Sequence, residues 1–240
     1  MKKWLAALLT LMLAFVMCLS MAHAEGVAFT GIRVGLQSSD YALTIFWYAD
    51  GEQPEEAFLQ DIQTVFFTAY PAMRETYGTT AVKEIGIYLW DASAMPENVP
   101  AYTSENNIHC SRQFLEDSRG NMNCIVHELF HVVQNGYPQA QNDALAAVLC
   151  EGLADVARYE YSVLEDPAWS LAKYAEGQSY MDSYTVTAAF LVWAAETYDE
   201  DLCLRLNRIL HEGGDASSAV STITGYSIDD LWNLYTQAAR

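Results

Sequence analysis

An H-E-x-x-H motif begins at His127, inside a segment whose apolar residues have the spacing of an α-helix. Apolar side chains recur three or four positions apart from 122 to 133, and the Asn135-Gly136 pair predicts the end of the helix. Residues four positions apart lie above one another on a helix, so His127 and His131 project from the same face. Two imidazoles in this arrangement can bind one zinc ion, and Glu128 can reach a water molecule beside it.

A second helical segment places an acidic residue at a suitable distance for a third ligand. A catalytic zinc ion generally takes three protein ligands and keeps a fourth position for water. Nineteen residues separate His131 from Glu151, which begins the sequence E-G-x-x-D. If the two helices pack side by side, Glu151 can face the ion, and Gly152 allows the backbones to approach closely. Asp155, one turn later, can accept the N–H of a ligating histidine and fix its tautomer.

The alternative is that both histidines are core residues and Glu151 is an ordinary surface charge. This alternative does not explain why the glutamate is flanked by a cysteine, a glycine and a leucine on an otherwise apolar face. The combination of H-E-x-x-H with E-G-x-x-D is also more specific than either pattern alone. We therefore expect His127, His131 and Glu151 to bind Zn2+, with Glu128 as the catalytic base.

Two tyrosines are candidates for a donor that stabilises an oxyanion near such a centre. Tyr184 directly precedes an apolar helical segment and is the first choice, and Tyr180 is the second. With fifteen tyrosines in the chain, a structural role is the alternative for both. His109, in an expected strand, and His211, at an expected helix end, are assigned structural or solvated positions.

The first 24 residues have the pattern of a signal peptide. Basic residues follow Met1, an apolar run extends from Trp4 to Leu19, and residues 22–24 form a small-x-small cleavage site. The apolar run is short for a membrane span. We expect residues 25–240 to form a single secreted domain, extracellular or in the cell envelope. Its N-terminal α/β part would cover about 25–136 and its helical part about 137–240.

The chain is strongly acidic, with a formal net charge of −19. Such a surface repels phosphate backbones and anionic lipid, so we expect neither nucleic acid nor a membrane as a partner of the mature protein. We expect the mature protein to be a monomer.

Four cysteines follow residue 24, at Cys110, Cys124, Cys150 and Cys203. An even number in an exported protein permits two disulfides, with three possible pairings. Two of the four lie on the apolar faces of the motif helices, which equally favours buried free thiols. The sequence leaves both possibilities open.

The remaining pattern predicts strands first and helices afterwards, which is typical of an α+β domain with a small mixed sheet. Two strands are expected over 27–48, a helix over 55–77 that Pro71 bends or interrupts, and a strand over 82–90. Short strands are expected at 102–103 and 108–111. Helices follow over 185–197, 201–211 and 215–223, and a capping box at Ser227 opens a last helix.

The chain resembles the plant and bacterial basic secretory protein family of peptidases in five ordered segments. These are AYTSENNIHCS, HELFHVVQNG, CEGLADVARYEY, SYTVTAAFLVW and GYSIDDLWNLYTQ. The resemblance extends from about residue 55 to the C-terminus and implies a zincin-like fold of the gluzincin type. By position it implies that the two histidines and Glu151 are zinc ligands, that Glu128 is the catalytic acid, and that Asp155 and Tyr184 match family residues. The acidity of this chain departs from the family's name.

These observations lead us to expect a secreted zinc metallopeptidase that acts on a peptide or protein substrate. The segment 106–111 would offer a strand edge to which an extended peptide could add. The competing expectation is a secreted binding protein that retains the fold, with little or no catalysis.

Overall fold

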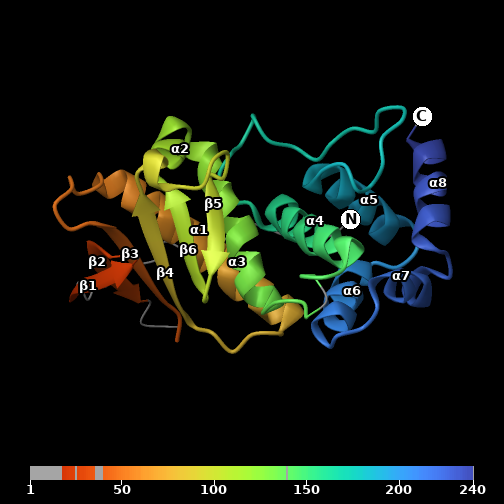
Figure 1. Cartoon of the computed structure of the whole chain (residues 1–240), viewed down its shortest axis with the longest axis horizontal. Helices are drawn as coiled ribbons and strands as arrows, with labels where there is room; N and C mark the ends of the chain where they lie inside the picture. The colour runs from red at the N-terminus through yellow and green to blue at the C-terminus, as the bar shows by residue number, and fades with distance from the viewer. Residues whose placement is uncertain (1–17, 25, 36–39, 139, 240) are drawn as a thin grey trace.

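The computed structural model describes residues 18–24, 26–35, 40–138 and 140–239 (Figure 1). Over these residues a six-stranded mixed sheet precedes a largely helical part, which confirms the expected α+β class. The strands are β1 (Cys18–Ala24), β2 (Val27–Gly35), β3 (Ala42–Tyr48), β4 (Glu84–Trp90), β5 (Ala101–Ser104) and β6 (Asn107–Ser111). The α-helices are α1 (Glu56–Tyr77), α2 (Arg112–Asp117), α3 (Cys124–Gln134), α4 (Ala144–Tyr161), α5 (Tyr184–Thr197), α6 (Leu202–His211), α7 (Ala216–Thr224) and α8 (Ile228–Ala238), and the short 3-10 helices are η1 (Ala92–Ala94) and η2 (Arg119–Asn123).

The sheet has the strand order β1-β2-β3-β4-β6-β5. Strands β3 and β4 are parallel because α1 crosses between them, whereas β5 and β6 form an antiparallel hairpin. Glu105 and Asn106, which join β5 to β6, have φ angles of 49° and 67°, and positive values at both positions are typical of a type I′ turn. The expectation that 106–111 offers a free edge is wrong, because β6 pairs with β4 on one side and β5 on the other. The edge strand at this end of the described sheet is β5.

Most predicted elements are present, but the effect expected of Pro71 on its helix differs. The hairpin expected over 27–48 is confirmed as β2 and β3. The last helix begins after Ser227, whose Oγ accepts the N–H of Asp230 at 3.1 Å. Pro71 does not interrupt its helix, since α1 continues from 56 to 77. Buried Phe66 and Met73, on either side of the proline, hold both halves of α1 to one apolar stripe.

Residues 1–17 of the expected signal peptide lie outside the described residues. Residues 18–24 form β1, which pairs antiparallel with β2 along its whole length. Removal of residues 1–24 would therefore leave β2 as the outer strand. In the part of the chain that is described, none of the helices combines the length and apolar character needed to cross a bilayer.

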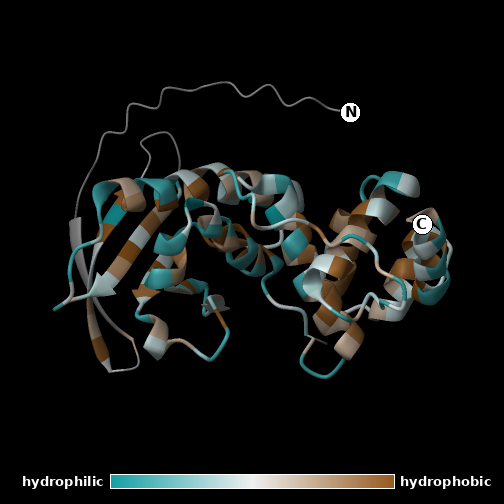
Figure 2. Ribbon diagram, turned by 90° about the horizontal axis from the view of Figure 1, so that it is seen from above, coloured by the Kyte–Doolittle hydropathy of each residue, from teal (hydrophilic) through white to brown (hydrophobic). Residues whose placement is uncertain are grey.

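The two faces of the sheet carry different cores. Helices α1 and α3 pack against one face, where they bury the main apolar cluster (Figures 1 and 2). The other face carries a smaller aromatic cluster that includes Trp90. His109 is buried there, stacked on Tyr88 and Tyr102 at centroid distances of 5.1 and 4.7 Å, and its Nδ1 accepts the indole N–H of Trp90 at 2.9 Å. The structure thus gives His109 a structural position.

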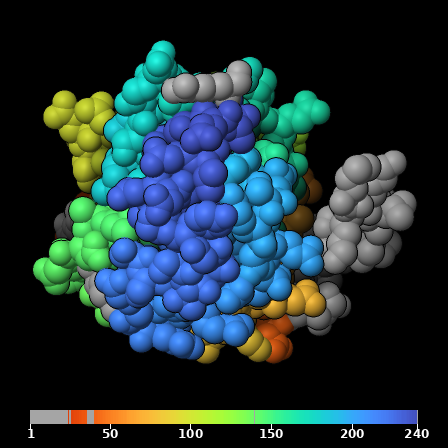
Figure 3. Space-filling view, turned by 90° about the vertical axis from the view of Figure 1, so that its right-hand side faces the viewer, coloured from red at the N-terminus to blue at the C-terminus, as the bar shows by residue number. Residues whose placement is uncertain are grey.

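Helix α4 lies between α3 and the C-terminal helices. Helices α6 to α8 form the face seen in Figure 3, on the side away from the sheet. Gly152 permits a close helix approach, as expected, but toward α5. A Cβ atom at Gly152 would lie 2.5 Å from Cγ2 of Thr187, well inside van der Waals contact. This close packing of α4 on α5 supports the segment that carries Glu151.

The structure contains four free thiols among the described cysteines, at Cys110, Cys124, Cys150 and Cys203. Three are buried, and Cys150 is half-buried at the contact between α3 and α4. Of the two possibilities left open by the sequence, this arrangement corresponds to buried free thiols.

Candidate metal centre and catalytic cleft

Helix α3 presents the H-E-x-x-H motif from a nearly completely buried segment. Its apolar side chains pack into the main core, and Leu129 and Phe130, which lie between the two histidines in the sequence, are fully buried. The helix ends at Asn135, which adopts a left-handed conformation with φ 52° and donates its N–H to the carbonyls of His131 and Val132. This end, which the sequence predicted, fixes the last turn on which His131 lies.

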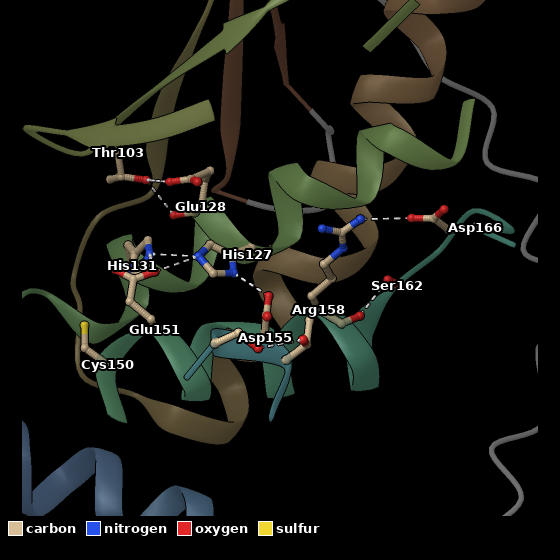
Figure 4. A network of polar contacts seen from close by, with 12 residues as sticks. Thr103, His127, Glu128, His131, Cys150, Glu151, Asp155, Arg158, Ser162 and Asp166 are labelled. Atoms are coloured by element: carbon tan, nitrogen blue, oxygen red, sulfur yellow. Dashed lines mark hydrogen bonds and ion pairs between the residues drawn. The ribbon is translucent and has the colours of Figure 1, made fainter. Parts of the chain in front are cut away.

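Helix α4 runs beside α3 and carries the acidic residues. It begins directly after Asp143, whose carboxylate caps the helix by accepting the N–H of Leu145 at 2.9 Å. Figure 4 shows Glu151 and Asp155 directed from α4 toward the two histidines of α3. The expectation that the two motif helices pack side by side is therefore fulfilled.

Three ligand atoms converge between these helices. The Nε2 atoms of His127 and His131 are 3.1 Å apart, and Oε2 of Glu151 lies 3.2 Å from the first and 3.6 Å from the second. Zinc bonded to nitrogen and oxygen at roughly 2.0–2.1 Å with tetrahedral angles requires ligand atoms about 3.3 Å apart. The three separations fit this requirement. All three atoms are acceptors in the neutral imidazole tautomers described below, so their grouping requires a cation or protons between them.

The other ring nitrogen of each histidine has its own partner. Nδ1 of His127 lies 2.8 Å from Oδ1 of Asp155, as the sequence predicted, and Asp155 is buried. Nδ1 of His131 lies 2.7 Å from Oε1 of Gln134. With Nδ1–H donated to these oxygens, each ring turns the Nε2 lone pair toward Glu151.

Gln134 is a site residue that the sequence reasoning missed. Its amide nitrogen donates to the backbone carbonyl of Cys150 at 2.8 Å, and the Cys150 thiol donates to its oxygen at 3.3 Å. One side chain thus joins His131 on α3 to the residue before Glu151 on α4. Its position three residues after His131, on the same helix face, was an available signal.

The electrostatics of the cluster couple its members. Burial alone would lower the pKa of His127, but hydrogen bonds to Asp155 and Glu151 outweigh it and raise that pKa to about 9. Burial would likewise lower the pKa of His131. Hydrogen bonds to Cys150 and Glu151, together with the charge of Glu128, outweigh burial and raise that pKa well above its usual value. Burial would raise the pKa of Glu151, yet its hydrogen bonds to both histidines hold it well below its usual range. In the absence of metal, protons on the imidazoles balance the carboxylates.

Glu128 lies on the other side of His127 from Asp155 (Figure 4). Its side chain is only 7% exposed, and its Oε2 accepts a hydrogen bond of 2.8 Å from Oγ1 of Thr103 on β5. The sequence reasoning also missed Thr103, because no local pattern reveals that β5 meets α3.

The cluster of His127, His131 and Glu151 opens into a cleft of about 1080 Å³. Residues of β5 line this cleft, and so do Trp169 and Tyr184. Arg158 fixes the position of Trp169. Its guanidinium lies 4.3 Å from the centre of the Trp169 ring and donates a hydrogen bond of 2.9 Å to Asp166. The cleft can therefore admit an extended chain beside the cluster.

The two tyrosine candidates lie at different positions relative to the cluster. Tyr184 is half-exposed in the cleft, with its ring 6.4 Å from that of His127. The hydroxyl of Tyr180 donates to Asp229 at 2.9 Å, and its ring packs against Trp232, away from the cluster. His211 lies outside the cluster too, with Nδ1 3.0 Å from the carbonyl oxygen of Gln134.

Comparison with known proteins gives a family and a shared fold. The family described as "Peptidase of plants and bacteria" (BSP) matches residues 38–235. No curated protein matches the sequence significantly. Among solved structures, aminopeptidase A of Legionella pneumophila, crystallised in complex with aspartic acid, is similar with a TM-score of 0.54 and 11% identity. The match covers 91% of this chain and 28% of the aminopeptidase, so this chain spans under a third of that enzyme's length.

The raised pKa of His127 predicts how the stability of the metal-free protein depends on pH. The ion pairs of the protonated ring contribute fully below about pH 6.5, the value for an unfolded histidine, and are lost as pH rises through about 9. The free energy of unfolding should therefore fall by about 3 kcal/mol between pH 6.5 and pH 9.5. Denaturant titrations in the presence of a chelator measure this change.

The matched control is Asp155→Asn, which removes the strongest partner of the protonated His127 ring and should make the fall in stability smaller. Stability of the wild-type protein that is constant or rises over the same interval would contradict this description of the cluster.

Proposed function

Because the chain belongs to the BSP family of plant and bacterial peptidases, we propose that it is a secreted, zinc-dependent metallopeptidase with a zincin-like fold. The proposal rests above all on one observation: two imidazole nitrogens and a carboxylate oxygen converge beside a second buried glutamate, in an open cleft. Peptides or proteins are the substrates. The signal-peptide pattern supports export, and we propose that the mature protein acts as a monomer.

In this proposal His127, His131 and Glu151 hold the zinc ion. When bound there, zinc supplies a Lewis acid that polarises a carbonyl group and lowers the pKa of a neighbouring water molecule. Asp155 and Gln134 keep the two imidazoles in the tautomer and orientation that binding requires. Their hydrogen bonds of 2.8 and 2.7 Å already provide this orientation.

Glu128 performs the proton transfers. Its carboxylate accepts a proton from the water molecule that attacks the scissile carbonyl carbon. The same group then delivers that proton to the leaving amine nitrogen as the C–N bond breaks. One residue can do both because the two steps follow each other in the same confined space.

Tyr184 is the candidate donor to the developing oxyanion. The negative charge of Glu151, together with burial, raises the pKa of Tyr184, so the phenol stays protonated and able to donate at neutral pH. Its place on the cleft wall near His127 allows it to face a substrate bound along β5.

The first test is the substitution Glu128→Gln. The amide has the shape of the carboxylate but cannot accept the proton, so peptide hydrolysis should fall about 100- to 10,000-fold while one equivalent of zinc is retained. Hydrolysis of a peptide library and zinc analysis measure the two quantities. Undiminished hydrolysis would remove Glu128 from the mechanism, and a zinc-loaded wild-type protein without any hydrolysis would favour the binding protein.

A second test compares two tyrosines. Tyr184→Phe should lower kcat about 10- to 100-fold, because the oxyanion loses a donor, with zinc content unchanged. Tyr180→Phe is the matched control, since its hydroxyl binds Asp229 away from the cleft, and it should retain activity. Equal kcat values for the two variants would exclude Tyr184 as the donor.

A further inference from the structure

We propose that Thr103 is a positioning residue for the catalytic base: its hydroxyl fixes one oxygen of the Glu128 carboxylate and leaves the other free for the attacking water. This inference rests on the proposed function, because it concerns the step that Glu128 performs. It adds a residue from the sheet to a site otherwise built from helices.

The alternation of side chains along β5 directs Thr103 toward the site. Successive residues of a strand point to opposite faces of the sheet. Tyr102 points to the face away from the helices, where it stacks on His109 at 4.7 Å. Thr103 therefore points to the face covered by α3, where Glu128 lies.

The Thr103 hydroxyl lies within hydrogen-bond distance of two oxygen atoms of Glu128. Oγ1 of Thr103 lies 2.8 Å from the carboxylate Oε2 of Glu128 and 2.9 Å from the backbone oxygen of the same residue. A hydroxyl has one proton, and the charged carboxylate is the stronger acceptor, so the proton goes chiefly to Oε2. Figure 4 shows Thr103 and Asp155 on opposite sides of the cluster.

Because the Glu128 carboxylate is buried, its orientation depends on this hydrogen-bond donor. Glu128 is only 7% exposed, and its carboxylate accepts a hydrogen bond from Thr103. A buried carboxylate that accepts no hydrogen bond destabilises the folded protein. Without a donor, no polar contact would fix the rotamer of its side chain. With Oε2 held, the rotation of the carboxyl group is restricted, and the remaining oxygen keeps one direction.

Threonine suits this task because it is β-branched. Its χ1 angle has few allowed values on a strand, so the hydroxyl is held in place with little loss of conformational entropy. The strand is also the edge that borders the cleft, so a substrate lying along β5 would be placed relative to the same residue that orients the base.

The kinetic test uses three variants of the full-length, zinc-loaded protein. Thr103→Val removes only the hydroxyl and should lower kcat about 10- to 100-fold, with KM and zinc content within about threefold of wild type. Thr103→Ser keeps the hydroxyl and should recover most of the lost kcat. Thr44→Val makes the same change in the half-buried part of β3, away from the cleft, and should leave kcat unchanged.

A second measurement needs no activity. In chelator-treated protein, the unfolding equilibrium constants of Thr103→Val, Glu128→Met and the double variant give the coupling between the two side chains. We expect coupling of about tenfold or more, because each single change abolishes the same hydrogen bond. Additive effects would show that Thr103 contributes to the strand alone.

The outcomes separate the inference from the proposed function. An active wild type whose kcat is unaffected by Thr103→Val, or reduced equally by Thr103→Ser, overturns the positioning role. An inactive wild type overturns the proposed function and the catalytic part of the inference together. In that case, strong coupling would still support the contact between Thr103 and Glu128.

Discussion

The packing of α4 against α3 is the interaction on which the site depends. Neither helix alone holds more than two of the converging groups, and Glu151 reaches the imidazoles only because the helices lie side by side. The contact is stabilised by apolar burial along α3 and by Gln134, which bonds across the two helices. On α4 itself, Gly152 allows close packing against α5. Loss of this packing would separate the acid from the histidines even if every side chain were intact.

Polar side chains around the cluster restrain the orientation of its members. Asp155 and Gln134 each bind the Nδ1 atom of one imidazole, and Thr103 of β5 binds the carboxylate of Glu128. Three different elements thus orient the groups that face the cleft. This arrangement would provide the preorganisation that the proposed hydrolysis requires, since the groups that face the cleft are already oriented.

The sequence predicted those features that are local to a helix. The H-E-x-x-H spacing, the end of α3 at Asn135 and the relation of Glu151 to Asp155 all follow from helical periodicity, and the structure brings these residues together. Gln134 follows the same periodicity and was accessible in principle. The features that were missed depend on tertiary contacts: Thr103 meets α3 only through the sheet, and the edge position of β5 is decided by which strand pairs with β6.

Two further differences have similar causes. Gly152 was expected to let the two motif helices approach closely, but the close neighbour in the folded chain is Thr187 on α5. Residues 18–24 have the composition of a signal-peptide end, and their pairing with β2 depends on a contact that composition does not encode. Local patterns therefore predicted which side chains come together better than they predicted the surroundings that support them.

The most direct measurement is zinc K-edge X-ray absorption on the zinc-loaded protein. We predict two imidazole nitrogens and one carboxylate oxygen at about 2.0–2.2 Å, with the oxygen contribution reduced in Glu151→Ala. A sulfur ligand at about 2.3 Å, or a spectrum unaffected by Glu151→Ala, would contradict this prediction.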